Sequence, residues 1–292
     1  NKPIVWTMHD MWPCTGICHH ARDCEKFQMG CESCFFLKSK GKDLSTSVFD
    51  KKLSLYKEAN ITFVGCSRWL SGRAKKSYLL RDKTVLSIPN PIDTEVYHPM
   101  DQDMTRELLG LPSGKRLLLF GALNVTDKRK GIDYLIEALR KIEKQDVELV
   151  VFGQVKDDIR GLFPVPIHSM GYLSDESKIV ALYNAVDMFI TSSLEENLPN
   201  TIMESMACGT PCVGFEIGGI PEMIDHKING YIASYKDASD LANGIQWVLE
   251  QDQLALSDAC VKKVQENYTE EVIVMKYLSL YQNILYKNDG KL

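Results

Sequence analysis

Short apolar runs alternate with longer amphipathic segments along the 292-residue chain. Runs such as 116–121 and 147–153 are almost wholly apolar, which is typical of strands buried on both faces of a parallel sheet. We predict strands over 3–8, 61–66, 84–88, 116–121, 147–153, 187–191, 211–215 and 229–233. Because helical stretches separate most of these strands, the pattern predicts an α/β fold.

A polar segment between the third and fourth predicted strands divides the chain into two parts. It begins with Asn90-Pro91 and contains a short helix at 102–110. The part after it, 115–268, has the strands and helices expected of one complete domain. Apolar positions spaced along 269–287, among them Val272 and Met275, predict a terminal amphipathic helix.

Composition and charge exclude several classes of protein. Hydrophobic residues make up 45% and charged residues 25% of the chain, as in ordinary globular domains. A net charge of −5 disfavours general nucleic-acid binding and provides no polybasic membrane anchor. No apolar run approaches the ~20 residues that a membrane-spanning helix needs, and nothing after Asn1 resembles a signal peptide. We therefore expect a cytoplasmic location.

A cysteine-rich segment, 14–34, follows the first strand. Its best set of metal ligands is Cys18, Cys24, Cys31 and Cys34, because four thiolates close a tetrahedral zinc site and the last two form a C-x2-C pair. Reduced cysteines in a packed loop and disulfides are the alternatives, and the latter are disfavoured in a reducing compartment. A structural zinc is thus one of three interpretations that the residues leave open.

Candidate chemistry concentrates in the segment 187–222. A buried strand leads to a loop with Glu196, a helix begins near Asn200, and Glu204 follows in that helix, eight residues after the first carboxylate. Free backbone N–H groups at a helix N-terminus suit a phosphate, and carboxylates suit sugar hydroxyls. This combination indicates a nucleotide-sugar site.

Four blocks in this order resemble retaining glycosyltransferases of family 4, which are glycosyl transferases group 1 with the GT-B fold. The first three are TMHDMWPCTG (7–16), SIPNPIDTEVYHP (87–99) and FGALNVTDKRKGIDYLIEAL (120–139), and the last is the Glu196 to Glu204 spacing followed by ACGTPCV and GGIPE. The resemblance implies two Rossmann-like domains facing a cleft, with the N-terminal one incomplete. The expected boundaries are 1–94 for that domain, 95–114 for the linker, 115–268 for the nucleotide-sugar domain and 269–292 for a helix that crosses back.

The resemblance also implies the roles of individual residues. Glu204 would bind the ribose, Glu196 the transferred sugar and Lys130 with Arg129 the diphosphate, while His9 would lie near the reacting groups. Arg129 is expected to replace an arginine that the family usually has after the strand glycine, where this chain has Ala122. Further donor contacts are expected from Asn197, Leu198, Pro199, Asn200, Gly121, Gly171, Gly218 and Gly219. Similar cysteine-rich insertions occur in bacterial relatives that make surface polysaccharides.

These roles imply a retaining transfer from a UDP- or GDP-sugar to a glycan or lipid-linked acceptor in cell-surface polysaccharide biosynthesis. No cofactor is expected to be required for catalysis, because cationic side chains serve in place of a metal. Peripheral contact with the inner face of the membrane is expected through a missing N-terminal part. A nucleotide-sugar-binding fragment without transfer activity and a nucleotide-sugar epimerase are the alternative functions.

Overall fold

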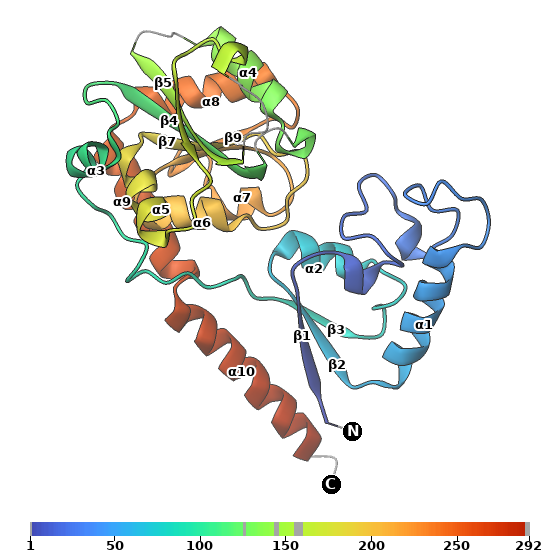
Figure 1. Ribbon diagram of the computed structural model, residues 1–292. Helices are drawn as coiled ribbons and strands as arrows, with labels where there is room; N and C mark the ends of the chain where they lie inside the picture. The colour runs from blue at the N-terminus through green and yellow to red at the C-terminus, as the bar shows by residue number, and fades with distance from the viewer. Residues whose placement is uncertain (1, 125–126, 143–145, 155–159, 290–292) are drawn as a thin grey trace. The chain divides into compact units, whose positions relative to one another are not determined.

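The computed structural model describes residues 2–124, 127–142, 146–154 and 160–289 (Figure 1). The chain forms two compact units, one of residues 1–90 with 273–292 and the other of residues 91–272. The whole of the expected linker, 95–114, thus belongs to the second unit. The expected crossover helix is α10 (Glu270–Asp289), and most of its length belongs to the first unit; its predicted last residues, 290–292, lie outside the described part.

The second unit is built on a six-stranded parallel sheet with the order β6-β5-β4-β7-β8-β9. Its strands are β4 (Arg116–Asn124), β5 (Val147–Gln154), β6 (Ile167–Gly171), β7 (Met188–Thr191), β8 (Cys212–Phe215) and β9 (Gly230–Ala233). The chain first builds outward from β4 to β6 and then returns to the other side of β4 with β7. The order therefore reverses between β4 and β7, which is where open α/β sheets bind their ligands.

Helices connect these strands and cover both faces of the sheet (Figure 1). They are α3 (Gln102–Leu109), α4 (Ile132–Lys141), α5 (Glu176–Ala185), α6 (Asn200–Ala207), α7 (Ile220–Met223), α8 (Ala238–Glu250) and α9 (Gln253–Asn267). Apolar residues of α4 and α8, including Leu139 and Ile245, pack with β4 and β8 in one buried cluster. Aspartates cap several of these helices; Asp237, for example, accepts from two backbone N–H groups at the start of α8.

The eight predicted strands are confirmed, but the sequence pattern missed β6. This strand pairs with β5 alone, at the edge of the sheet, and its residues are half-buried or exposed. His168 interrupts its apolar pattern, and its Nε2 lies 2.6 Å from Glu148 Oε2 on β5. An edge strand needs no continuous apolar run, so its sequence carries a weak signal.

A buried ion pair joins α3 to the sheet of the second unit. The Arg106 guanidinium lies 2.9 Å from Asp187 Oδ2 and also donates to the carbonyls of Ala185 and Lys115, while both charged side chains are almost fully buried. Asp187 accepts in addition from Leu117 N at 2.7 Å. These contacts explain why the segment before β4 is a packed part of this unit.

The first unit has a three-stranded parallel sheet of β1 (Ile4–Met8), β2 (Ile61–Gly65) and β3 (Thr84–Ser87). Helices α1 (Leu44–Glu58) and α2 (Arg68–Lys75) connect its strands. Residues of α10 pack on this sheet, with Ile273 and Leu280 in one apolar cluster with Val64 and Ile88. The hydroxyls of Thr7 and Tyr277 are 2.8 Å apart.

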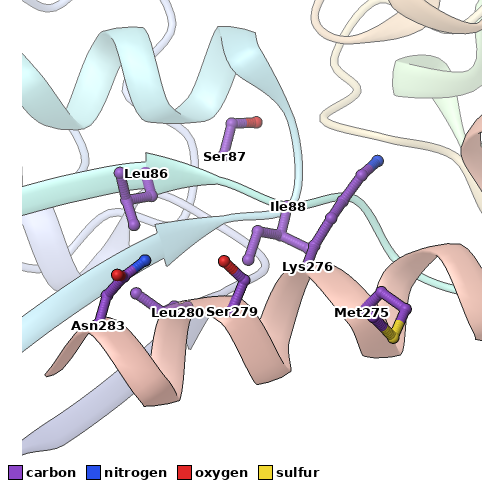
Figure 2. Close-up of a pocket in the computed structure, with 8 residues that line it drawn as sticks. All are labelled: Leu86, Ser87, Ile88, Met275, Lys276, Ser279, Leu280 and Asn283. Atoms are coloured by element: carbon purple, nitrogen blue, oxygen red, sulfur yellow. The ribbon is translucent and has the colours of Figure 1, made fainter. Parts of the chain in front are cut away.

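Beside β3 and α10 the first unit has a groove of ≈ 490 Å³ (Figure 2). Its lining comes from three residues around β3 and five of α10: Leu86, Ser87, Ile88, Met275, Lys276, Ser279, Leu280 and Asn283. In the part of the chain that the structure describes, no helix combines the length and the apolar character needed to cross a membrane.

Candidate functional site

Three loops of the second unit follow the carboxyl ends of neighbouring parallel strands. The first, 127–131, follows β4; the second, 192–199, follows β7; and the third, 216–219, follows β8. Because these strands are adjacent in the sheet, their loops gather at one edge, at the point where strand order reverses. Most of the residues predicted to bind the donor lie in these loops.

Backbone contacts hold the first two loops together. Leu194 N donates to Arg129 O at 2.7 Å, and the Ser192 hydroxyl donates to Lys130 O at 2.9 Å. Gly131 has a φ of 65°, and a Cβ at this position would lie 1.9 Å from Ser192 O. Glycine is therefore required here, both for the left-handed backbone and for the close approach.

The third loop is joined to the second in the same way. Gly219 N donates to Asn197 O at 2.5 Å. Gly218 has a φ of 58°, and a Cβ there would lie 2.0 Å from Glu196 O. The two glycines predicted as donor contacts thus position the loop that carries Glu196, a structural role that the sequence did not reveal.

The structure brings together two residues that were predicted separately, Lys130 and Glu196. Lys130 Nζ lies 2.5 Å from Glu196 Oε1. The carboxylate side chain is 15% exposed and the lysine side chain 34% exposed, so the pair lies at the edge of the protein with one side open to solvent. A cation and a carboxylate are therefore held at the switch point of the sheet.

Arg129 forms its ion pair within its own loop. Its guanidinium contacts the Asp127 carboxylate at 2.7 Å, and this hydrogen bond holds the pKa of Asp127 below its usual range. Its side chain remains 62% exposed. The expected role of Arg129 at the diphosphate stays a prediction. Asp127 was not predicted; its position two residues before Arg129 is its only signal in the sequence.

Glu204 lies on α6 and is mostly buried. Its Oε2 accepts from the hydroxyl of Tyr183, on α5, at 2.8 Å. Burial raises the pKa of Glu204, while the hydrogen bond from Tyr183 opposes that shift. Among the described residues, no donor contacts its other oxygen. Tyr183 was missed by the sequence analysis because it occupies an ordinary apolar position in the helix before β7.

The predicted contacts that precede Glu204 surround the start of α6. Pro199 occupies the N-cap, Asn200 is the first helical residue, and no side-chain oxygen of the cap accepts from the first turn. The side chains of Asn197 and Leu198 are buried, and their role as donor contacts stays a prediction. The α6 N-terminus nevertheless supplies N–H donors and the positive end of a helix dipole.

Two further predicted glycines lie in strands of the sheet, Gly121 within β4 and Gly171 at the end of β6. Gly171 is the last residue of β6 and has a φ of 64°, and a Cβ there would meet no atom within 4 Å. Gly121, by contrast, lies under Phe152, whose ring would be 1.9 Å from an added Cβ. The absence of a side chain at Gly121 is thus explained by packing within the sheet.

His9 belongs to the other unit, where it directly follows β1 and is exposed. The cysteine-rich segment after it is anchored by Lys52 of α1, whose buried ammonium donates to the carbonyls of Trp12, Thr15 and Gly16. It also lies 3.5 Å from the centre of the Trp12 ring. Lys52 carried no functional signal in the sequence.

Cys18, Cys24, Cys31 and Cys34 are free, half-buried thiols. Burial raises the pKa of Cys31 to about 11, a hydrogen bond from Gly16 N opposes this, and the other three thiols contribute to the rise. The four thiols are therefore close enough for charge on one to affect the pKa of another. Within the described residues, however, no three His, Cys, Asp or Glu side chains are arranged to hold a metal ion. The zinc site stays a prediction.

A family model matches most of the second unit. Residues 114–251 match the family described as "Glycosyl transferases group 1". The N-acetyl-alpha-D-glucosaminyl L-malate synthase of Bacillus anthracis is 26% identical over 211 residues, which cover 70% of this chain and 55% of that protein. The chain spans about half the length of the first curated relatives it matches.

Solved structures show the same fold over nearly the whole chain. The sucrose-phosphate synthase of Thermosynechococcus elongatus matches with a TM-score of 0.73 and 20% identity, covering 97% of this chain and 68% of that one. The Anabaena protein HepE, in complex with UDP-glucose, matches with a TM-score of 0.73 and 17% identity over 97% and 72% of the two chains. The predicted α/β fold is confirmed as that of GT-B glycosyltransferase structures, and residues 114–251 match glycosyl transferases group 1.

Proposed function

We propose that the chain is part of a retaining glycosyltransferase and that its second unit binds the nucleotide-sugar donor. The contact between Lys130 and Glu196 carries this proposal. It puts a cation for phosphate and an acceptor for sugar hydroxyls at the switch point of a parallel sheet. The family match over 114–251 supports the same reaction class.

The donor would be a UDP- or GDP-sugar. Glu204 would accept hydrogen bonds from ribose hydroxyls through the carboxylate oxygen that Tyr183 does not contact. The α6 N-terminus and Lys130 would bind the diphosphate, and Glu196 with the backbone of Gly218 and Gly219 would bind the sugar. HepE, a protein of similar fold, was solved with UDP-glucose, which supports a uridine donor as the first to test.

The chemistry would replace the bond between the anomeric carbon and the leaving phosphate oxygen by a bond to an acceptor hydroxyl. Attack on the face that the phosphate leaves retains the anomeric configuration, and the acceptor proton passes to the departing phosphate oxygen. Charge accumulates on the diphosphate as the bond breaks, so Lys130 and Arg129 would stabilise the transition state more than the ground state. No metal is needed in this scheme.

The acceptor would be a glycan or a lipid-linked sugar, as in the synthesis of cell-surface polysaccharides. The reaction would then take place in the cytoplasm, at the inner face of the membrane. His9 would lie on the acceptor side of the reaction. A zinc ion bound by the four thiols would give the segment after His9 a fixed shape; its role would be structural.

Calorimetric titration of the purified chain with UDP, GDP and their common sugar conjugates tests the donor site. Glu204→Gln keeps the size of the side chain but loses its charge, and Glu222→Gln, on α7, is a control with the same chemical change. We expect micromolar binding of one nucleotide that Glu204→Gln weakens by about tenfold or more, as for a hydrogen bond to a charged group. If the folded chain binds neither nucleotide, the proposed donor site is wrong.

A further inference from the structure

Three consecutive apolar side chains are exposed in the loop between the cysteine-rich segment and α1. Phe35 is 71% exposed, Phe36 44% and Leu37 38%. The rings of the two phenylalanines meet edge to face with centroids 5.6 Å apart, and the Arg22 guanidinium lies 5.4 Å from the centre of the Phe36 ring. Adjacent exposed aromatic residues are unusual on a protein surface and indicate contact with another surface.

The loop is a defined turn. Leu37 N and Lys38 N donate to the carbonyls of Cys34 and Phe35, each at 3.2 Å. Its two ends are tied to Asp43, the N-cap of α1, which accepts from Cys34 N at 2.7 Å and also from the Ser39 hydroxyl. The apolar tip is therefore held outward by hydrogen bonds of the turn itself.

Lysines follow the apolar tip directly. Lys38, Lys40 and Lys42 are exposed, and between Phe35 and Lys42 the sequence contains no acidic residue. Asp43 already accepts several hydrogen bonds from its neighbours. Among the residues that the structure describes, none of the three ammonium groups has an acidic partner. The loop thus carries three positive charges in a chain whose net charge is −5.

We propose that the loop 35–42 binds the surface of a membrane that contains anionic lipids. Aromatic side chains at a loop tip can enter the headgroup region, and lysines next to them contact lipid phosphates and carboxylates. An apolar tip with lysines beside it matches a membrane surface, where anionic headgroups lie next to an apolar interior. Burial of the same loop against another protein would require an apolar pocket with acidic groups around it. This contact lies in the described chain and does not depend on donor binding or on sugar transfer.

Co-sedimentation with vesicles tests the proposal with the chain as it is. Vesicles of phosphatidylcholine alone are compared with vesicles that also contain phosphatidylglycerol, at low and high salt. We expect binding only to the anionic vesicles, reduced by salt because the Debye length falls from about 10 Å at 0.1 M to 3 Å at 1 M. Each lysine should contribute about fivefold to the partition coefficient.

Two loop variants separate the apolar and charged contributions. Phe35→Ser should reduce partitioning by about tenfold or more, and the double variant Lys40→Gln/Lys42→Gln by roughly 25-fold. Controls are Leu254→Ser, at a residue also 71% exposed but in α9, and Lys51→Gln/Lys57→Gln, at exposed lysines of α1. Equal binding to both kinds of vesicle, no vesicle binding, or equal losses in loop and control variants would each overturn the proposal.

Discussion

Replacing Lys130 by methionine removes the ammonium group that contacts Glu196 and leaves a flexible side chain in its place. In the proposed function this ammonium group binds the donor diphosphate. A hydrogen bond between charged groups contributes about 1.5–3 kcal/mol, so Lys130→Met should weaken UDP binding by roughly 10- to 150-fold. Uridine has no phosphate, so its affinity should not change.

Glu196→Gln should have the opposite effect on UDP. The glutamate holds Lys130 in the free protein, and the lysine side chain is 34% exposed, so the ion pair contributes at most about 1 kcal/mol. Releasing Lys130 should leave UDP affinity unchanged or raise it by no more than about fivefold. The UDP-sugar should lose the additional affinity it has over UDP, because Glu196 is the proposed sugar contact.

The assay is calorimetry with uridine, UDP and the UDP-sugar, after circular dichroism shows that each variant is folded. Lys128→Met removes an exposed lysine of the same loop, and Glu195→Gln removes the neighbouring carboxylate. Both controls should bind like the unmodified chain. Equal losses for uridine and UDP in Lys130→Met, or a stronger effect from Glu195→Gln than from Glu196→Gln, would refute the assignment.

Three other outcomes follow from the contacts described. Because burial raises the pKa of Glu204 above the usual carboxyl pKa of 4.5, nucleotide affinity should begin to fall at a pH above 4.5 as the pH is lowered. Calorimetric titrations at several pH values measure this fall, and in Glu204→Gln it should be absent. Arg106→Met leaves Asp187 buried without its main partner and should cost about 3–5 kcal/mol in urea unfolding, whereas Arg116→Met, at a side chain that is 46% exposed, should cost at most about 1 kcal/mol. If the thiols bind zinc, elemental analysis should find about one metal per chain that Cys31→Ser loses, and metal-free folded protein would exclude the site.

Most of the fold could be predicted because buried parallel strands leave a direct signal. Strands such as β5 and β7 are buried along most of their length, so they appear in the sequence as apolar runs. The half-buried edge strand β6 has no such run and was missed. The sequence also did not reveal that 95–114 belongs to the second unit. That packing depends on the contact between Arg106 and Asp187, which is 81 residues away.

The candidate site was predictable in its residue types and less so in its contacts. The sequence singled out Glu196 and Glu204 by their spacing and Lys130 by the family resemblance, and their roles at the donor stay predictions. The partners of Arg129 and Glu204 were not singled out, because Asp127 and Tyr183 have no distinguishing pattern around them. A hydrogen bond such as that between Tyr183 and Glu204 depends on how two helices pack, and a single sequence does not record that packing.

The placement of Glu196 depends on backbone contacts more than on its own side chain. Two glycines pack closely against the loop after β7. Gly131 lies against Ser192 O, and Gly218 lies against Glu196 O. Both glycines have left-handed backbones, and in each case an added Cβ would collide with a carbonyl oxygen, which cannot move without its strand-end loop. Any other residue at either position would displace the loop that holds the carboxylate against Lys130. The Gly-Gly turn at 218–219 therefore fixes the position of the loop that carries Glu196.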